Sequence, residues 1–127
     1  MADAAVAAAL LFAGGTHLVP LVGLLGGKRL QSLYGLGPLP TASLRLVLRH
    51  RAVLFGLLGV PMVVAAAVPA WQPAAVGAGL VSAGSFLLLS WAEGGGQALT
   101  PQLQRVVRAD LAVVAVLASA GLLLTCR

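Results

Sequence analysis

Apolar residues form four long runs along the chain, and shorter polar stretches separate them. The runs cover about residues 4–25, 49–69, 73–92 and 106–125. Each comes close to the roughly 20 apolar residues that an α-helix needs to cross the hydrocarbon core of a bilayer. We therefore predict an all-α fold, an integral membrane antiparallel four-helix bundle, with residues 1–127 as a single transmembrane domain.

The first connection predicts a short extra helix. This loop, residues 26–48, is the longest. It contains the amphipathic segment KRLQSLYG, which we expect to lie flat on the membrane with its apolar side chains down. Thr41 or Ser43 can cap the second long helix, so that LRLVLRHR forms its first two turns.

The other two connections carry turn and hinge signals. Pro69 and Pro73 bracket a tight turn between the second and third helices. Three consecutive glycines at residues 94–96 predict a flexible hinge after the third helix. Thr100 followed by Pro101 is typical of a helix N-cap with proline at the first helical position, so the fourth helix is expected to begin there.

The composition excludes an ordinary water-soluble domain. Of the 127 residues, 60% are hydrophobic and 9% are charged, whereas soluble domains are about 25% charged. A small soluble fold leaves about a third of its chain surface exposed, and so it could not cover this much apolar surface. The first run lacks the positively charged segment that opens a signal peptide, so we expect it to be retained as a membrane helix.

The distribution of basic residues predicts the orientation in the membrane. Cytoplasmic loops of membrane proteins carry an excess of Lys and Arg. We therefore predict a multi-pass protein of the inner (plasma) membrane, with cytoplasmic first and third loops and both termini outside. Topology and contact with anionic lipid explain these cations, and no nucleic-acid partner is predicted. Apart from Arg127, the basic residues lie in or beside the first and third loops: Lys28, Arg29, Arg45, Arg49, Arg51, Arg105 and Arg108.

This topology brings ionisable side chains from all four helices to the cytoplasmic end. A carboxylate inside a membrane helix costs about 2.5–3.5 kcal/mol on insertion scales, so Asp110 must gain a partner. Its candidate partners are His17, His50, and Arg49 or Arg51. Asp110 is then either part of a structural ion pair or a binding or catalytic carboxylate. His17 is either hydrogen-bonded, to Asp110 or to a carbonyl freed by a nearby proline, or an acid/base group.

Helical spacing separates residues that are close in sequence. Arg49 and Arg51 are two residues apart, about 200° around a helix, so at most one of them can easily face the bundle interior. Arg108 and Asp110 have the same spacing. If Asp110 points inward, Arg108 can extend to the lipid head groups.

Three residues near the membrane boundary are further candidates for ligand binding. Glu93 ends the third helix, where a negative charge is electrostatically unfavourable, so it is either solvated or paired with an arginine. Tyr34 and Trp91 are placed as interfacial aromatic anchors or as ligand contacts.

Several familiar motifs of catalysis and cofactor binding are absent from the sequence, which has no Walker loop, GxGxxG, HExxH or CxxC. His17 and His50 are too few for a metal site without help from carboxylates, and haem between them would need both at one depth. We therefore predict no metal and no cofactor. The single cysteine, Cys126, cannot form an internal disulfide.

Four segments carry a resemblance to a known family. LYGL, LRHRAVLFGLLG, GLVSAGSFLLL and RVVRADL resemble a family of small bacterial four-helix membrane proteins whose members are often mislabelled phosphopantetheine adenylyltransferase. The soluble enzyme of that name is an α/β protein with an H-x-G-H motif, which this chain lacks. The layout is also loosely similar to DoxX-like membrane proteins. The resemblance implies the four-helix architecture and assigns no catalytic residue.

These observations leave three functional hypotheses. The first is a binding or accessory module whose polar cluster, with Arg49 and Arg51, holds an anionic lipid, a lipid-like metabolite or a partner subunit. The second is a membrane-embedded isomerase or hydrolase that acts on an apolar substrate by acid–base chemistry of Asp110 and His17, with His50 as a further candidate. The third is a small transporter. Either a homo-oligomer or a complex with another subunit is compatible with the sequence.

Overall fold

The computed structural model describes residues 2–38, 41–95 and 99–126, and these residues form helices and short connections without a strand. The prediction of an all-α fold is confirmed. The α-helices are α1 Ala2–Leu18, α2 Gly27–Tyr34, α3 Ala42–Ala67, α4 Gln72–Ala92 and α5 Pro101–Thr125, and the 3₁₀ helices are η1 Val19–Leu25 and η2 Pro69–Trp71.

Two predicted caps set where α3 and α5 begin. The Thr41 hydroxyl accepts a hydrogen bond from the Leu44 amide at 3.1 Å. The Thr100 hydroxyl accepts one from the Leu103 amide at 3.3 Å, with Pro101 at the first helical position. Both helices therefore start ahead of their apolar runs, and the first loop is shorter than the 26–48 expected.

The first apolar run is divided into two helical pieces. Proline has no amide proton to donate and its ring crowds the preceding turn. The α-helical geometry of α1 ends at Leu18, and Pro20 lies in the tighter 3₁₀ helix η1 that follows. The expected single helix over residues 4–25 is therefore present as α1 followed directly by η1. Its hydrogen-bonding pattern changes from α-helical to 3₁₀ after Leu18.

Among the described residues, four segments are long and apolar enough to cross a membrane, as the hydropathy pattern predicted. They are Asp3–Leu25, Ala42–Ala67, Pro69–Ala92 and Pro101–Thr125. Large apolar side chains are exposed on the outer faces of these helices, including Leu57, Val81 and Leu122. Such faces are suited to lipid, because a helix satisfies its own backbone groups and needs only apolar side chains on the outside.

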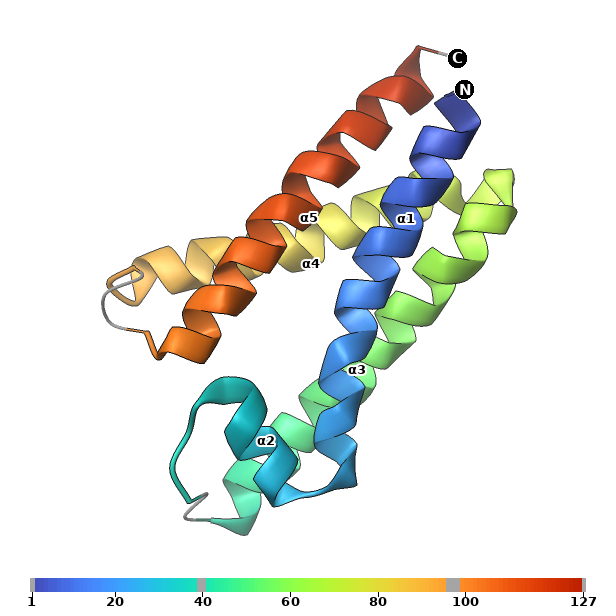
Figure 1. Ribbon diagram of the computed structural model, residues 1–127. Helices are drawn as coiled ribbons and strands as arrows, with labels where there is room; N and C mark the ends of the chain where they lie inside the picture. The colour runs from blue at the N-terminus through green and yellow to red at the C-terminus, as the bar shows by residue number, and fades with distance from the viewer. Residues whose placement is uncertain (1, 39–40, 96–98, 127) are drawn as a thin grey trace.

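The long helices are not all nearly parallel. Figure 1 shows α1, α3 and α5 running along one general direction, α1 opposite to α3 and α5, with both termini at the same end. Helix α4 crosses this direction obliquely. The core between them is apolar and includes Leu10, Met62, Val76, Val113 and Leu117.

Helix α2 packs on the protein itself. Leu30 and Tyr34 are buried together, against Leu48 of α3 and Leu103 of α5. The expected helix is present, but these two side chains are covered by protein, where lipid contact had been expected. Gly35 ends α2 in the left-handed conformation (φ 63°).

The glycine hinge is described only in part. Gly94 and Gly95 have φ values of 98° and 71°, which favour glycine. The third glycine of the predicted hinge, Gly96, lies outside the described residues.

Candidate functional site

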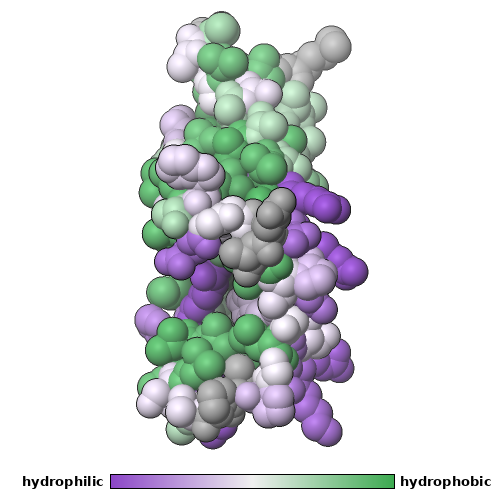
Figure 2. Space-filling model, turned by 90° about the vertical axis from the view of Figure 1, so that its left-hand side faces the viewer, coloured by the Kyte–Doolittle hydropathy of each residue, from purple (hydrophilic) through white to green (hydrophobic). Residues whose placement is uncertain are grey.

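Hydrophilic side chains gather in one part of the molecule. Figure 2 shows a mostly hydrophobic surface at the end that carries the termini, whereas hydrophilic residues begin at mid-height and continue below it. Hydrophilic and hydrophobic residues together border a hollow in the lower half of this face. This distribution agrees with the prediction that the helices bring their ionisable groups to one end.

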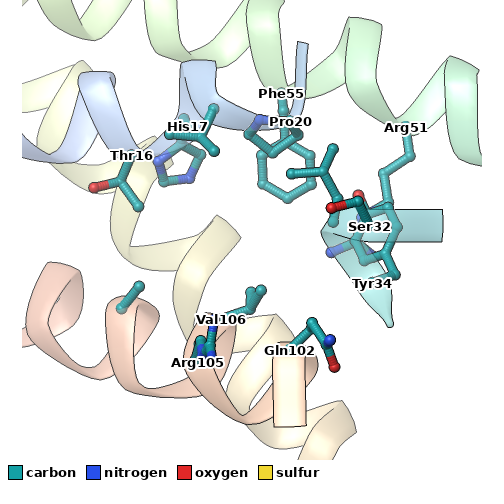
Figure 3. Close-up of a pocket in the computed structure, with 13 residues that line it drawn as sticks. Thr16, His17, Pro20, Ser32, Tyr34, Arg51, Phe55, Gln102, Arg105 and Val106 are labelled. Atoms are coloured by element: carbon teal, nitrogen blue, oxygen red, sulfur yellow. The ribbon is translucent and has the colours of Figure 1, made fainter. Parts of the chain in front are cut away.

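A pocket of about 390 Å³ opens at this end, between α1 with η1, α2, α3 and α5. Its volume is within the range of small-molecule sites, about 300–1,000 Å³. Figure 3 shows residues of α1 and α3 facing residues of α5 across the open space, with α2 closing one side. The apolar wall consists of Val19, Pro20, Leu33, Phe55, Val106 and Ala109. The polar wall consists of Thr16, His17, Ser32, Tyr34, Arg51, Gln102 and Arg105.

Arg51 is the half-buried cation of this pocket. Its guanidinium carbon lies 4.9 Å from the ring centroid of Phe55, 5.2 Å from that of Phe86 and 5.9 Å from that of Tyr34. All three distances are within the roughly 6 Å of a cation–π contact. The Nε atom is buried and has no hydrogen-bond partner among the described residues. The aromatic rings therefore hold the guanidinium in place without using its donors.

Asp110 interacts electrostatically with Arg51 but does not line the pocket. The residue is 6% exposed, and its carboxylate attracts the Arg51 guanidinium electrostatically. The two side chains do not form a direct ion pair in the structure, and Asp110 is not among the residues that line the cavity. Asp110 thus offsets part of the cationic charge without lining the cavity, and the Arg51 Nε keeps no partner among the described residues.

His17 is fixed by hydrogen bonds on both ring nitrogens. Its Nδ1 lies 2.8 Å from the Ala13 carbonyl oxygen, which can only accept, so Nδ1 carries a proton and donates it. Its Nε2 lies 3.2 Å from the Ser82 hydroxyl, which can donate to it in the neutral ring. The ring is 5.5 Å from that of Phe55. Neither predicted partner binds His17: the acceptor is not Asp110, and the Ala13 carbonyl lies one turn back along the same helix, too far from Pro20 to be the carbonyl that the proline frees.

The remaining predicted residues of α3 are separated from Arg51. Arg49 is exposed and its Nη2 donates to the Leu24 carbonyl at 3.4 Å. His50 is exposed and does not line the pocket. The two-residue spacing of Arg49 and Arg51 predicted this division between an outer and an inner position.

Three other predicted binding residues lie away from the pocket. Arg108 is exposed, as expected from its spacing to the buried Asp110. Glu93 and Trp91 are exposed at the end of α4, and Trp91 is 79% exposed. Tyr34, by contrast, is buried and lines the pocket.

Sequence reasoning missed several residues of the site. Phe55 follows Arg51 by four positions, so the two share a helix face, and this signal could have identified it. Phe86, Ser82 and Gln102 reach the site from other helices, and no local pattern marks them.

Metal binding finds no support in the part of the chain that the structure describes. No group of three or more His, Cys, Asp or Glu side chains there could hold a metal ion. The two histidines are in different surroundings, since His17 is buried and His50 is exposed.

Comparisons with family models, with curated proteins and with solved structures gave no significant match to this chain. The resemblance to the four-helix family therefore stays a prediction from the sequence.

Proposed function

We propose that this protein is a membrane-embedded binding module that holds an amphiphilic anion, with the anionic head group on Arg51 and an apolar part against the pocket walls. A lipid head group and a lipid-like metabolite share this chemistry, which is a carboxylate or phosphate attached to an apolar body. In the predicted topology the pocket lies at the cytoplasmic end of the helices.

The unpartnered Nε of Arg51 carries this proposal. A buried donor without an acceptor costs about 1–3 kcal/mol, and more when the group is charged. Carboxylate and phosphate oxygens match the planar fork of a guanidinium. An anion in the pocket would pair with the Arg51 guanidinium and, after a shift of the surrounding side chains, supply the acceptor that the buried Nε lacks among the described residues. The apolar wall around Phe55 and Val106 suits the rest of an amphiphile.

The two other hypotheses have less support. Acid–base chemistry by Asp110 and His17 needs both groups at one cavity, and only His17 lines the pocket. A transporter needs ionisable groups with access from both sides. The surface near the termini is mostly hydrophobic on the face seen in Figure 2.

Arg51→Gln tests the proposal, with Arg49→Gln as its matched control. Both changes remove one positive charge from α3, but only Arg51 lines the pocket. We would measure equilibrium binding of radiolabelled palmitate and hexadecyl phosphate to the protein in mild detergent. We expect Arg51→Gln to weaken binding of at least one probe by about tenfold or more, because a charged hydrogen bond is lost.

Arg49→Gln is expected to bind like the unmodified protein. Arg51→Lys keeps the charge and loses the fork, so it should bind with intermediate strength. The proposal is wrong if the unmodified protein binds neither probe, or if the two glutamine variants are weakened equally.

A further inference from the structure

A second cavity lies on the other side of Arg51. It has a volume of about 230 Å³ and is formed between α3 and α4. Arg51 and Phe55 line both this groove and the larger pocket, so the two cavities adjoin at a shared wall that includes these two side chains. The other residues of the α3–α4 groove are Leu54, Leu58, Ser82, Ser85, Phe86 and Leu89.

The two cavities differ in the residues around them. The larger pocket includes polar side chains of α2 and α5, such as Ser32 and Arg105, both of which are exposed. The α3–α4 groove is bordered by Leu54 and Leu89, which are 51% and 65% exposed. Both leucines belong to segments apolar enough to cross a membrane. The groove is therefore accessible to the hydrocarbon of the bilayer, and the larger pocket to its polar boundary.

We infer that the α3–α4 groove takes the end of the single alkyl or isoprenyl chain of the ligand whose head group binds Arg51, while the part of the chain next to the head group lies against the pocket walls. This inference rests on the proposed function and specifies the ligand class. Both cavities border Arg51 and Phe55, which supports one ligand that uses both. The cation at the shared wall and the leucines at the groove match the two ends of a single-chain carboxylate or phosphate ester. Such a ligand would enter from the membrane between α3 and α4.

Arg51 and Phe55 lie where the head group and the chain of such a ligand would meet. Phe86 on the groove side and Tyr34 on the pocket side lie on either side of the guanidinium, at 5.2 Å and 5.9 Å. If an anion binds Arg51 from the pocket side, its chain would run past the Phe55 ring toward the groove. The hydroxyl of Ser85 donates to the Ser82 carbonyl of its own helix, so its proton is already used and does not need a partner in the groove.

Filling the groove tests the inference while leaving the larger pocket intact. Ser85→Trp and Leu54→Trp would each place a large ring in the groove, from α4 and from α3 respectively, and neither residue lines the larger pocket. Gly77→Trp is the control, because Gly77 is on α4 and has open space around its Cβ position. Binding would be measured for palmitate against hexanoate, and for hexadecyl phosphate against hexyl phosphate.

We expect the two groove variants to weaken binding of the long-chain probes by about tenfold or more, while short-chain probes and the Gly77→Trp variant are unchanged. Each probe partitions into detergent to the same extent whichever variant is present. The ratio of a variant's affinity to that of the unmodified protein therefore reports the effect of filling the groove. The carboxylate and phosphate pairs distinguish the two kinds of head group.

The possible failures are distinguishable. If long-chain probes bind and the groove variants have no effect, the groove inference is wrong and the proposed function stands. If the groove variants weaken long and short probes equally, the groove inference is also wrong. If the unmodified protein binds no probe, both proposals are wrong.

Discussion

At the scale of single residues, Arg49, His50 and Arg51 are consecutive but occupy three different environments. Arg49 contacts a backbone carbonyl at the surface, His50 is exposed, and Arg51 lines the pocket. The spacing of the two arginines on a helix was sufficient to predict their separation. The aromatic surroundings of Arg51 were not predictable, because Tyr34 and Phe86 come from α2 and α4 and only tertiary packing brings them to it.

The electrostatic role assigned to Asp110 gives a prediction at this scale. Asp110 attracts Arg51 without lining the pocket. Asp110→Asn should therefore increase the positive potential at the Arg51 guanidinium and strengthen binding of hexadecyl phosphate by about threefold or more. The measurement is equilibrium binding in mild detergent at low ionic strength, where electrostatic effects are screened least.

Glu93→Gln is the matched control, because it removes a carboxylate that is exposed at the end of α4. It should leave binding unchanged. If Asp110→Asn weakens binding instead, Asp110 acts by positioning Arg51 or by contacting the ligand, and its assignment as a compensating charge fails.

At the scale of the elements, the helix boundaries followed from local chemistry, and the packing of the elements did not. The caps at Thr41 and Thr100 act on the neighbouring backbone and were predicted. The change to a 3₁₀ helix around Pro20 is also local, but a single helix had been expected there. The burial of α2 was missed, because an amphipathic helix shows the same pattern whether its apolar face meets lipid or protein. The contact of Tyr34 with Arg51 depends on this packing.

The crossing of α1 and α3 gives the prediction at this scale. A Cβ atom on Gly14 would lie 2.8 Å from Val63 Cγ2 and 2.9 Å from the Gly59 carbonyl oxygen. Gly14→Val should therefore force the two helices apart and lower the free energy of unfolding by about 1–3 kcal/mol. Denaturant unfolding in detergent, followed by circular dichroism, would measure the change.

Gly15→Val is the matched control on the same helix, because nothing lies within 4 Å of a Cβ atom at Gly15. It should change the free energy of unfolding by no more than about 0.5 kcal/mol. Equal losses for the two variants would mean that the cost comes from valine in a helix and not from the close approach of α1 and α3.

At the scale of the whole molecule, the sequence predicted an all-α chain with four apolar helices, because composition and run length determine which solvent the chain requires. The oblique path of α4 was not predictable. Crossing geometry depends on how side chains of different helices fit together, and periodicity on one helix does not contain that information. The α3–α4 groove was not predictable for the same reason, because its two walls come from different helices.

The orientation in the membrane gives the last prediction. The positive-inside rule predicts that the termini lie outside and the pocket at the cytoplasmic end. Cys126 is exposed and is the single cysteine of the chain. A membrane-impermeant maleimide should therefore label it in intact spheroplasts. In a Cys126→Ser background, Gly37→Cys places a thiol in the first loop, where Gly37 is exposed. This thiol should react only after permeabilisation. The opposite labelling pattern would place Arg51 on the outer side, and the ligand would then have to come from the outer leaflet.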